Sequence, residues 1–484
     1  IHVYDNNTIT NAVAGSITGN STDLWGIRVN TGNTVLNNGT VSVSGTNSTA
    51  FLAQGDNNTL TNNGTISASG TGSYAAKFLG TGNALVNSGT ISGNLWFDAG
   101  NNTFTNNGTF DGSGGLYKAG SGTLTLRGPT SYTGGTYLNG GVINVTQDAS
   151  LGALSGGLVF GGGTLQLSAD VTSARNATLN SGGGTFDTNG NTLTLSKVIS
   201  GPGSLTKAGA GTLILSGTNT YTGGTVFNGG TVNVAGWANL GGSANALTFG
   251  GGTLLLAGVD VLQSGFPVPA NGVNFNTVSG SQTVNGVLSG SGAVTVSGPG
   301  TLILSGTNTY TGGTVLNSGT LSISSDTNLG AVSGTLTFNG GTIQPSLPFN
   351  TSRGITVNSG GGSFNNNGQT SSLGGSFTGS GPFTFTGSAG LTLSGNGSGY
   401  TGQGTVSEGL LFLTSGASMG GTLTVNPGAT VGGYGTLGRV INNGIVSPGG
   451  SVGTITLNGN YTQGSAGKLL IEVASSTSND LVAV

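Results

Sequence analysis

Hydrophobic and polar residues alternate along this chain in many short runs. TLTL at residues 123–126, TLIL at 212–215 and TVNV at 231–234 are typical, and Gly-Gly, Asn-Gly or Ser-Gly pairs separate such runs. A two-residue alternation bounded by turn residues predicts β-strands with one buried face. No stretch shows the sustained period of an amphipathic helix. The pattern therefore predicts an all-β protein.

In residues 1–110 the runs recur with a short period. Similar units start at positions separated by 26, 25, 25 and 19 residues, namely Asn7, Asn33, Asn58, Asn83 and Asn102. A unit of about 25 residues holds three short strands and their turns, which is the content of one coil of a β-solenoid. We expect residues 1–110 to form one section of such a solenoid.

A longer period follows. Equivalent tyrosines stand 89, 89 and 90 residues apart, at Tyr132, Tyr221, Tyr310 and Tyr400. Each of these super-repeats has the length of about four coils. They divide the chain into residues 1–110, a super-repeat section over 111–413, and a C-terminal section over 414–484.

Stacked coils account for the residue types in these runs. Alternate apolar side chains face inward and stack on those of the next coil, while Thr and Ser line the outside. We expect Gly to supply positive φ at the corners and Asn to stack into amide ladders. The sequence predicts a β-solenoid that extends as an elongated rod.

Composition and charge exclude several classes of protein. The 484 residues include 100 Gly without a G-X-Y register, which excludes collagen. Because cysteine is absent, neither disulfides nor thiolate metal sites exist. The net charge is −3 and no basic stripe occurs, so we expect no nucleic-acid partner. We find no signal peptide or transmembrane helix, and because the chain starts at Ile1 we interpret it as a segment of a longer protein.

One motif carries a family resemblance. GSLTKAGAGTLILSGTNTYTGGT at residues 203–225 resembles the passenger-associated transport repeat of Gram-negative autotransporters, and the other three tyrosine-centred copies are similar to it. Val296 replaces the lysine of the earlier copies, and Gln403 replaces the second Gly of TGG in the fourth. The resemblance implies a right-handed parallel β-helix that is exported across the outer membrane to the cell surface or the extracellular medium.

The C-terminal residues 420–484 resemble the autochaperone segment that precedes the translocator barrel in the same family. That resemblance implies that the chain's own outer-membrane barrel is a partner during secretion. We expect the barrel itself to lie outside this sequence.

Candidate catalytic groups are few. The single histidine, His2, lies at the start of the chain, which leaves no credible place for a Ser-His-Asp triad. Carboxylate pairs that could serve a polysaccharide-acting enzyme are Asp98 with Asp111, and Asp170 with Asp187 near Arg175. We interpret these as isolated loop acids. Residues 182–190 match a calcium-binding nonapeptide poorly. Taken together, these observations predict that the protein is not an enzyme and binds no metal or cofactor.

The repeat signature itself offers two further sets of residues. Lys118 and Lys207 occupy equivalent positions, and we interpret them as surface or edge charges that discourage strand addition. The four tyrosines could form an exposed line that contacts glycans or another rod. Alternatively, each tyrosine caps a turn, with its ring over a glycine and its hydroxyl in water. We interpret this signature, Lys118, Lys207 and the four tyrosines, as structural.

These observations and the resemblance predict a structural and adhesive extracellular rod that acts in cell-cell association, surface attachment or biofilm matrix. Its expected partners are other copies of itself, surface glycans, and host or matrix proteins. One alternative is a fibre or sheath subunit that stacks end to end. A polysaccharide-acting enzyme is the third possibility.

Overall fold

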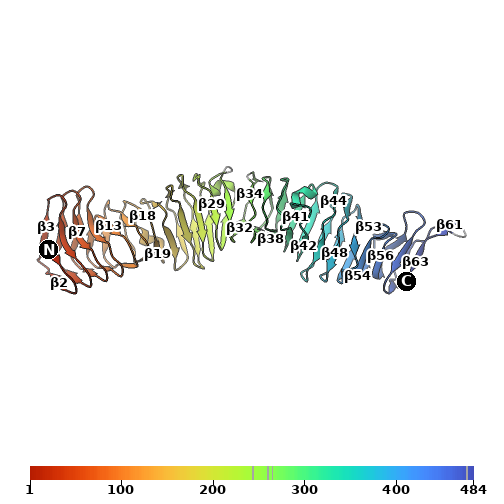
Figure 1. Cartoon of the computed structure of the whole chain (residues 1–484), viewed down its shortest axis with the longest axis horizontal. Helices are drawn as coiled ribbons and strands as arrows, with labels where there is room; N and C mark the ends of the chain where they lie inside the picture. The colour runs from red at the N-terminus through yellow and green to blue at the C-terminus, as the bar shows by residue number, and fades with distance from the viewer. Residues whose placement is uncertain (243–244, 259–260, 264, 476–477) are drawn as a thin grey trace. The chain divides into compact units, whose positions relative to one another are not determined.

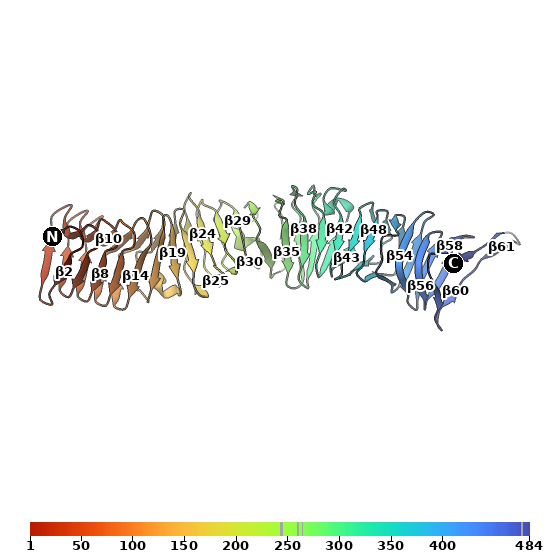
Figure 2. The same ribbon diagram turned by 60° about the horizontal axis from the view of Figure 1, so that its bottom comes forward.

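The computed structural model describes the protein over residues 1–242, 245–258, 261–263, 265–475 and 478–484. Within these residues the chain forms two compact units, Ile1–Thr248 and Phe249–Val484. In each unit, strands from successive turns lie side by side in parallel sheets (Figures 1 and 2). The prediction of an all-β, parallel β-helical fold is confirmed. The helices in the described part are short 3-10 helices: η1 (Asp148–Leu151), η2 (Trp237–Leu240) and η3 (Asp326–Leu329).

Four sheets run through the first unit. One contains, in spatial order, β1 (His2–Val3), β4 (Trp25–Val29), β7 (Thr49–Ala53), β10 (Tyr74–Phe78), β13 (Asn94–Phe97), β16 (Leu116–Lys118), β18 (Thr136–Leu138), β20 (Leu158–Phe160), β23 (Ala177–Leu179) and β26 (Ile199–Ser200). A second contains β2 (Thr8–Asn11), β5 (Thr34–Asn37), β8 (Thr59–Asn62), β11 (Ala84–Asn87), β14 (Asn102–Asn106), β17 (Thr123–Arg127), β19 (Val142–Val145), β21 (Thr164–Leu167), β24 (Gly184–Asp187), β27 (Leu205–Ala208) and β29 (Thr225–Phe227).

Of the other two sheets of this unit, one is formed by the early turns and the other by the later turns. The early turns use β3 (Ser16–Gly19), β6 (Thr40–Val43), β9 (Thr65–Ala68), β12 (Thr90–Ser92) and β15 (Thr109–Asp111). The later turns use β22 (Val171–Ser173), β25 (Thr192–Leu195), β28 (Thr212–Leu215) and β30 (Thr231–Val234). Strand β31 (Leu247–Phe249) spans the boundary between the units.

The second unit repeats this plan. One of its sheets contains β32 (Thr253–Leu256), β35 (Val273–Thr277), β38 (Val294–Ser297), β40 (Thr314–Leu316), β42 (Leu336–Phe338), β45 (Ile355–Val357) and β48 (Phe377–Gly379). Another contains β44 (Phe349–Thr351), β47 (Ser371–Leu373), β50 (Gly390–Leu393), β53 (Gly409–Leu413), β55 (Ala429–Gly433), β57 (Ile445–Pro448) and β60 (Lys468–Leu469). A short pair is formed by β34 (Phe266–Pro267) and β37 (Leu288–Ser289).

The longest sheet of the second unit reaches its C-terminal end. It contains β33 (Val261–Leu262), β36 (Ser281–Val284), β39 (Thr301–Leu304), β41 (Thr320–Ile323), β43 (Thr342–Pro345), β46 (Gly362–Asn365), β49 (Phe383–Thr386), β51 (Asn396–Gly397), β52 (Gln403–Val406), β54 (Ser418–Val425), β56 (Thr436–Asn442), β58 (Thr454–Leu457), β59 (Tyr461–Gln463) and β63 (Leu481–Ala483). The strands β61 (Val473–Ser475) and β62 (Ser478–Asn479) pair antiparallel, whereas the ladders of the sheets described above are parallel.

The core is built from columns of stacked apolar side chains. In one column, Val35 lies next to Leu60, Leu60 next to Leu85, Leu85 next to Phe104, and Phe104 next to Leu126. All of these side chains are buried. Because strand residues point alternately to opposite faces, the Thr residues between them face outward. The alternating runs of the sequence therefore encode one inner and one outer column for each strand.

Buried asparagines form the predicted amide ladder inside the first unit. The Nδ2 group of each donates to the Oδ1 atom of the asparagine one turn further on, over 2.7 to 2.8 Å, through Asn11, Asn37, Asn62, Asn87 and Asn106. Asn62 Nδ2 also donates to the carbonyl of Thr90 at 3.1 Å. The ladder therefore satisfies polar atoms that burial would otherwise leave unpaired.

In the Asn-Asn-Gly turn at residues 62–64 and the Asn-Ser-Gly turn at residues 87–89, glycine is required for a reason other than the predicted positive φ. An added Cβ at Gly64 would lie 2.0 Å from the carbonyl oxygen of Gly39, and one at Gly89 would lie 2.1 Å from that of Gly64. Gly64 and Gly89 do not have positive φ, whereas Gly72 (φ +71) and Gly82 (φ +69) do. Close approach of successive turns, and not only handedness, therefore selects glycine here.

Candidate functional site

The four signature tyrosines are enclosed within the solenoid. Each of these residues is 0 % exposed: Tyr132, Tyr221, Tyr310 and Tyr400. The tyrosines therefore do not form the exposed line that the sequence left open as a possibility, and the expectation that their hydroxyls lie in water is wrong. Tyrosine rings do pack on glycine, because an added Cβ at Gly152 or Gly330 would lie 2.7 or 2.8 Å from the ring of Tyr132 or Tyr310. These tyrosines offer no surface to a ligand.

In the first three copies the tyrosine hydroxyl forms a hydrogen bond with the side chain of a buried threonine. The two side-chain oxygens lie 2.6, 2.6 and 2.7 Å apart in the pairs Tyr132–Thr136, Tyr221–Thr225 and Tyr310–Thr314. In the fourth copy the fourth residue after the tyrosine is Gly404, and Tyr400 donates instead to the carbonyl of Gly381 at 2.9 Å. A buried phenol therefore has a partner in every copy, as burial requires.

Burial also determines the protonation of these phenols. Desolvation raises the pKa of Tyr310 and of Tyr400 to about 12, although hydrogen bonds oppose the rise. The same cause raises the pKa of Tyr132 and Tyr221. The hydroxyls therefore remain neutral and serve as hydrogen-bonding groups.

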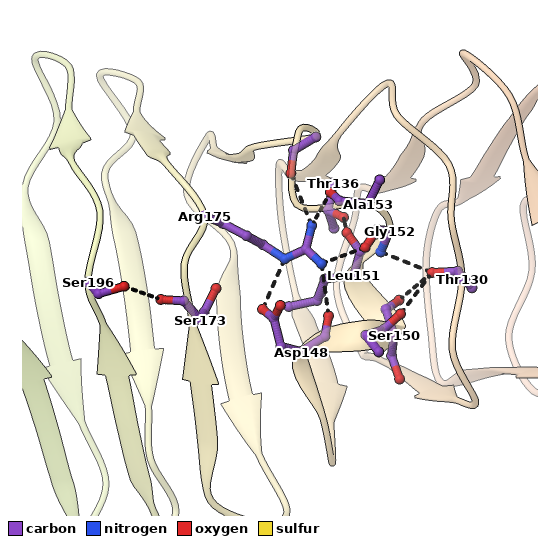
Figure 3. A network of polar contacts seen from close by, with 12 residues as sticks. Thr130, Thr136, Asp148, Ser150, Leu151, Gly152, Ala153, Ser173, Arg175 and Ser196 are labelled. Atoms are coloured by element: carbon purple, nitrogen blue, oxygen red, sulfur yellow. Dashed lines mark hydrogen bonds and ion pairs between the residues drawn. The ribbon is translucent and has the colours of Figure 1, made fainter.

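A buried arginine holds the turn beside the first tyrosine (Figure 3). Arg175 Nε donates to Asp148 Oδ1 at 2.9 Å, and the arginine side chain is 1 % exposed. Nη1 donates to the carbonyls of Ala153 and Gly156, while Nη2 donates to those of Asp148 and Gly152. All five guanidinium N–H groups are thereby used. The arginine closes the loop around η1 from inside the solenoid.

This arrangement differs from the predicted one. The sequence suggested Arg175 as a neighbour of Asp170 and Asp187, but its charge partner is Asp148. Asp170 instead accepts the backbone N–H of Thr192 at 2.7 Å. Asp187 accepts from Gln166 Nε2 at 2.8 Å and from the backbone of Asn189 at 3.0 Å. These two carboxylates thus organise turns.

The third copy reproduces the arginine network. Arg353 Nε donates to Asp326 Oδ1 at 2.8 Å, and the other guanidinium hydrogens bind carbonyls of Asp326, Gly330, Ala331 and Gly334. Both arginines, and both aspartates, are separated by 178 residues, which is two super-repeats. That shared spacing was present in the sequence and would have identified the pairs.

The second copy is built differently. Trp237 stands at the position of Asp148 and Asp326, and it opens η2. Asn245 closes the turn here, because its Nδ2 donates to the carbonyl of Leu240 at 2.7 Å and its Oδ1 accepts from the Gly224 backbone at 3.0 Å. The same motif can therefore be closed without an ion pair.

The signature lysines are also buried, so their interpretation as surface or edge charges is wrong. Lys118 and Lys207 are both 0 % exposed. Lys118 Nζ donates to the carbonyls of Asp98 (2.6 Å), Gly120 (3.2 Å) and Ser121 (3.0 Å), and also to that of Ala119. Carbonyl oxygens of the turns thus solvate an inward-pointing ammonium group.

Lys207 repeats this cage in the next copy. Its Nζ donates to the carbonyls of Ala208 and Gly209 at 2.7 Å each and of Gly229 at 3.3 Å. Burial lowers the pKa of Lys207 to about 8, and the charge of Asp187 opposes that shift. Burial lowers the pKa of Lys118 as well, against the charge of Asp98. Val296 fills the corresponding core position in the third copy, where it is 0 % exposed.

Comparison with known proteins identifies these copies. The family described as passenger-associated-transport-repeat matches residues 116–145, 205–234 and 294–323. These ranges include the first three signature tyrosines and both lysines. In addition, 106 residues of the chain are 45% identical to a protein of Brucella suis biovar 1 (strain 1330) named "Adhesin BmaC autotransporter". The chain is an autotransporter passenger segment. This passenger is therefore exported across the outer membrane to the cell surface.

The match to the Brucella protein is local. It covers 22% of the passenger and 3% of that protein, so the passenger spans a small fraction of its relative. No solved structure matches the passenger. The fourth tyrosine-centred copy and the autochaperone-like residues 420–484 lie outside the matched repeats, and their roles stay predictions.

The remaining candidate groups are dispersed. Within the described residues no group of three or more His, Asp or Glu side chains is arranged to hold a metal ion. His2 is exposed and lies against Tyr4, with ring centroids 4.9 Å apart. In the part of the chain that the structure describes, no helix has the length and apolar character needed to cross a membrane.

Proposed function

We propose that the passenger is a structural and adhesive protein of the bacterial surface, which attaches cells to one another or to a substratum. The observation that carries this proposal is the sequence match to a relative named an adhesin. The proposed role requires no catalytic centre. It requires a stable scaffold and an outer surface that can make many contacts.

The outward columns supply such a surface. Thr40, Thr65, Thr90 and Thr109 form one of them, each in register with the next. Hydroxyl columns repeated on every turn support many weak contacts that act together, so that avidity exceeds the affinity of any one contact. The buried signature residues, in contrast, hold the turns and leave the outer face free to vary.

The proposal is tested by displaying the passenger on a bacterium that does not aggregate. Settling of the culture and retention on surfaces or cultured cells are measured against a strain that displays an equal amount of an unrelated solenoid. Adhesion requires a clear gain in at least one measurement. No gain in any of them, with the passenger shown to be on the surface, would overturn the proposal.

The same preparation distinguishes the other candidate functions. Electron microscopy that finds open-ended filaments with no gain in adhesion would favour the fibre or sheath subunit. Turnover of a polysaccharide that is lost in Asp170→Asn and Asp187→Asn variants would favour an enzyme. We propose a non-enzymatic role and expect neither result.

A further inference from the structure

The outer face of the first unit contains a slot between two aromatic side chains. Trp25 on β4, Thr49 on β7 and Tyr74 on β10 are in register on three successive turns. Trp25 is 48 % exposed, and Tyr74 is partly exposed. The small Thr49 between two large rings leaves a gap one turn wide.

The next outward row repeats this arrangement with charged walls. Arg28, Leu52 and Lys77 are in register on the same three strands. Together the two rows enclose a hollow of about 510 Å³, which Asp23 and Gln54 also line. The floor is Thr49 and Leu52, and each wall combines one aromatic ring with one cation.

The dimensions of the slot suit one flat ring. Adjacent turns are about 4.8 Å apart, so side chains two turns apart are separated by roughly 10 Å. An inserted ring can then contact aromatic groups on both sides. Pockets of this kind bind ligands through apolar walls and a few fixed polar groups. A pyranose, with its flat C–H faces and its rim of hydroxyl groups, has the matching shape.

The charges select the kind of sugar. The whole chain has only 10 Lys and Arg residues, and two of them line this hollow. Arg28 lies 4.6 Å from the Trp25 ring centroid, and Lys77 lies 5.3 Å from that of Tyr74. Neither cation has a carboxylate partner among the described residues, where the ion pairs are those of Arg175 and Arg353. Arg28 donates from Nε and Nη2 to Gln54 Oε1, which leaves its other three guanidinium hydrogens and the Lys77 ammonium group available to an anionic group of a ligand.

An aromatic row extends this surface away from the slot. Trp96 follows Lys77 in register, and Tyr117 and Tyr137 follow on the next two turns. The Tyr117 and Tyr137 rings stack with centroids 4.3 Å apart. Further sugar units of a chain bound in the slot would meet these rings.

We propose that this slot binds a carboxylated sugar, such as a uronic or sialic acid unit of a surface glycan, with its ring between Trp25 and Tyr74 and its carboxylate at Arg28 and Lys77. The inference deepens the proposed adhesive function and rests on it for its biological role. Single-stranded nucleic acid also combines stackable rings with negative charge. A phosphate backbone, however, carries a charge about every 3.4 Å along each strand, and the slot offers two cations, which match a single carboxylate better than a run of phosphates.

Titration calorimetry with the purified chain tests the proposal. The probes are trigalacturonate and sialyllactose, with galactotriose and lactose as their neutral counterparts and a single-stranded oligonucleotide as competitor. Because one charge-assisted contact corresponds to about tenfold in affinity, we expect at least one acidic sugar to bind at least about tenfold more tightly than its neutral counterpart. Equal binding of acidic and neutral sugars, binding of the oligonucleotide alone, or no binding at all would overturn the proposal.

Variants locate the site. Trp25→Ala and Lys77→Gln should each weaken acidic-sugar binding about tenfold or more. Thr49→Tyr should abolish binding by filling the slot, although it adds an aromatic ring. The matched control Lys197→Gln, at an exposed lysine elsewhere in the first unit, should leave binding unchanged. Unchanged binding by Trp25→Ala and Thr49→Tyr would contradict the assignment, and amide exchange of each variant verifies that β4, β7 and β10 remain folded.

The two proposals fail in different ways. If the displayed passenger adheres but binds no acidic sugar, the slot assignment is wrong and the adhesive function stands. If the purified chain binds acidic sugar through Trp25 but the displayed passenger does not adhere, the adhesive function is wrong.

Discussion

The first five turns and the transport repeats solve the same problem with different residues. In both regions, tight turns point backbone carbonyl groups toward the core, and these groups need hydrogen-bond donors. The early turns use a column in which each asparagine donates to the next, from Asn11 to Asn106. The transport repeats use isolated devices, such as Arg175 with its five donors and Lys118 in its carbonyl cage.

This difference concerns how far a defect spreads. In a ladder each member depends on its neighbours in both directions, so one replacement breaks a chain of hydrogen bonds. A buried arginine holds the carbonyl groups of one loop and forms an ion pair there. When one member of that pair is removed, the other member is left as an unpaired charge. Because solenoid stability is approximately a sum of turn and interface contributions, a ladder defect should reach the two neighbouring turns, whereas an arginine defect should stay within its own loop.

Replacement of Arg353 should have the largest effect. Arg353→Met leaves Asp326 and four backbone carbonyls without their donor, and removal of one partner from a buried ion pair costs about 3–5 kcal/mol. We expect faster amide exchange around residues 326–334, measured by mass spectrometry. Arg439→Met, which changes an exposed arginine of the same unit, is the control. Equal exchange in the two variants would show that the network does not hold the turn.

Interruption of the ladder should have the next largest effect. Asn62→Ala removes one of the two acceptors of Asn37 Nδ2, whose other acceptor is the Thr65 carbonyl, and leaves Asn87 Oδ1 without its donor. We expect a loss of about 1–3 kcal/mol. Amide exchange should rise on the turns of both Asn37 and Asn87. The neighbouring Asn63, whose hydrogen bond to Asn38 is exposed, supplies the control Asn63→Ala. A rise confined to the mutated turn would argue against ladder cooperation.

Removal of a single phenol hydroxyl should have a smaller effect. Tyr310→Phe keeps the ring and loses the bond to Thr314, which costs about 1 kcal/mol. Tyr400→Phe should cost a similar amount, because its partner is a carbonyl. The two variants are compared by urea-dependent amide exchange. A much larger loss in only one of them would mean that the copies are not equivalent.

The buried lysine Lys207 should make the stability of the folded passenger depend on pH. The pKa of Lys207 is lowered to about 8 in the folded passenger from the ordinary 10.5. Between these values the unfolded chain binds a proton that the folded chain lacks, so this residue makes stability rise with pH. Lys207→Val, which copies Val296, should flatten that rise in melting temperatures recorded from about pH 7.5 to 10. An unchanged slope would contradict the lowered pKa.

The sequence predicted the scaffold better than the role of individual residues. Periods of 25 and 89 residues depend on local alternation and on turn residues, which a sequence displays directly. The inward direction of Lys118 was missed because a polar residue in an alternating run was assigned to the outside by its chemistry. Yet Lys118 alternates with Tyr117, which faces outward, and that alternation already indicated its direction. The inward direction of Tyr132 was missed because this residue lies in the loop between β17 and β18, where no alternation indicates a direction.

Other features could not be predicted from the chain in this way. Arg175 meets Asp148 across 27 residues, a contact that depends on how the turn containing η1 folds back. The slot at Trp25 arises because the rows of β4, β7 and β10 place Thr49 between two rings, and this requires the register of three turns. Spacings of 178 residues between the two arginines and between the two aspartates were the available signal for the ion pairs.

The central claim is that the transport-repeat signature is internal and that binding takes place on the outer face. Nitration of the folded chain by tetranitromethane, followed by peptide mass spectrometry, tests it most directly, because the chain has 10 tyrosines that serve as mutual controls. The account predicts that exposed Tyr4 and Tyr434 react and that Tyr132, Tyr221, Tyr310 and Tyr400 react only after unfolding in guanidinium. Nitration of the four repeat tyrosines in the folded chain at the rate of Tyr4 would contradict it.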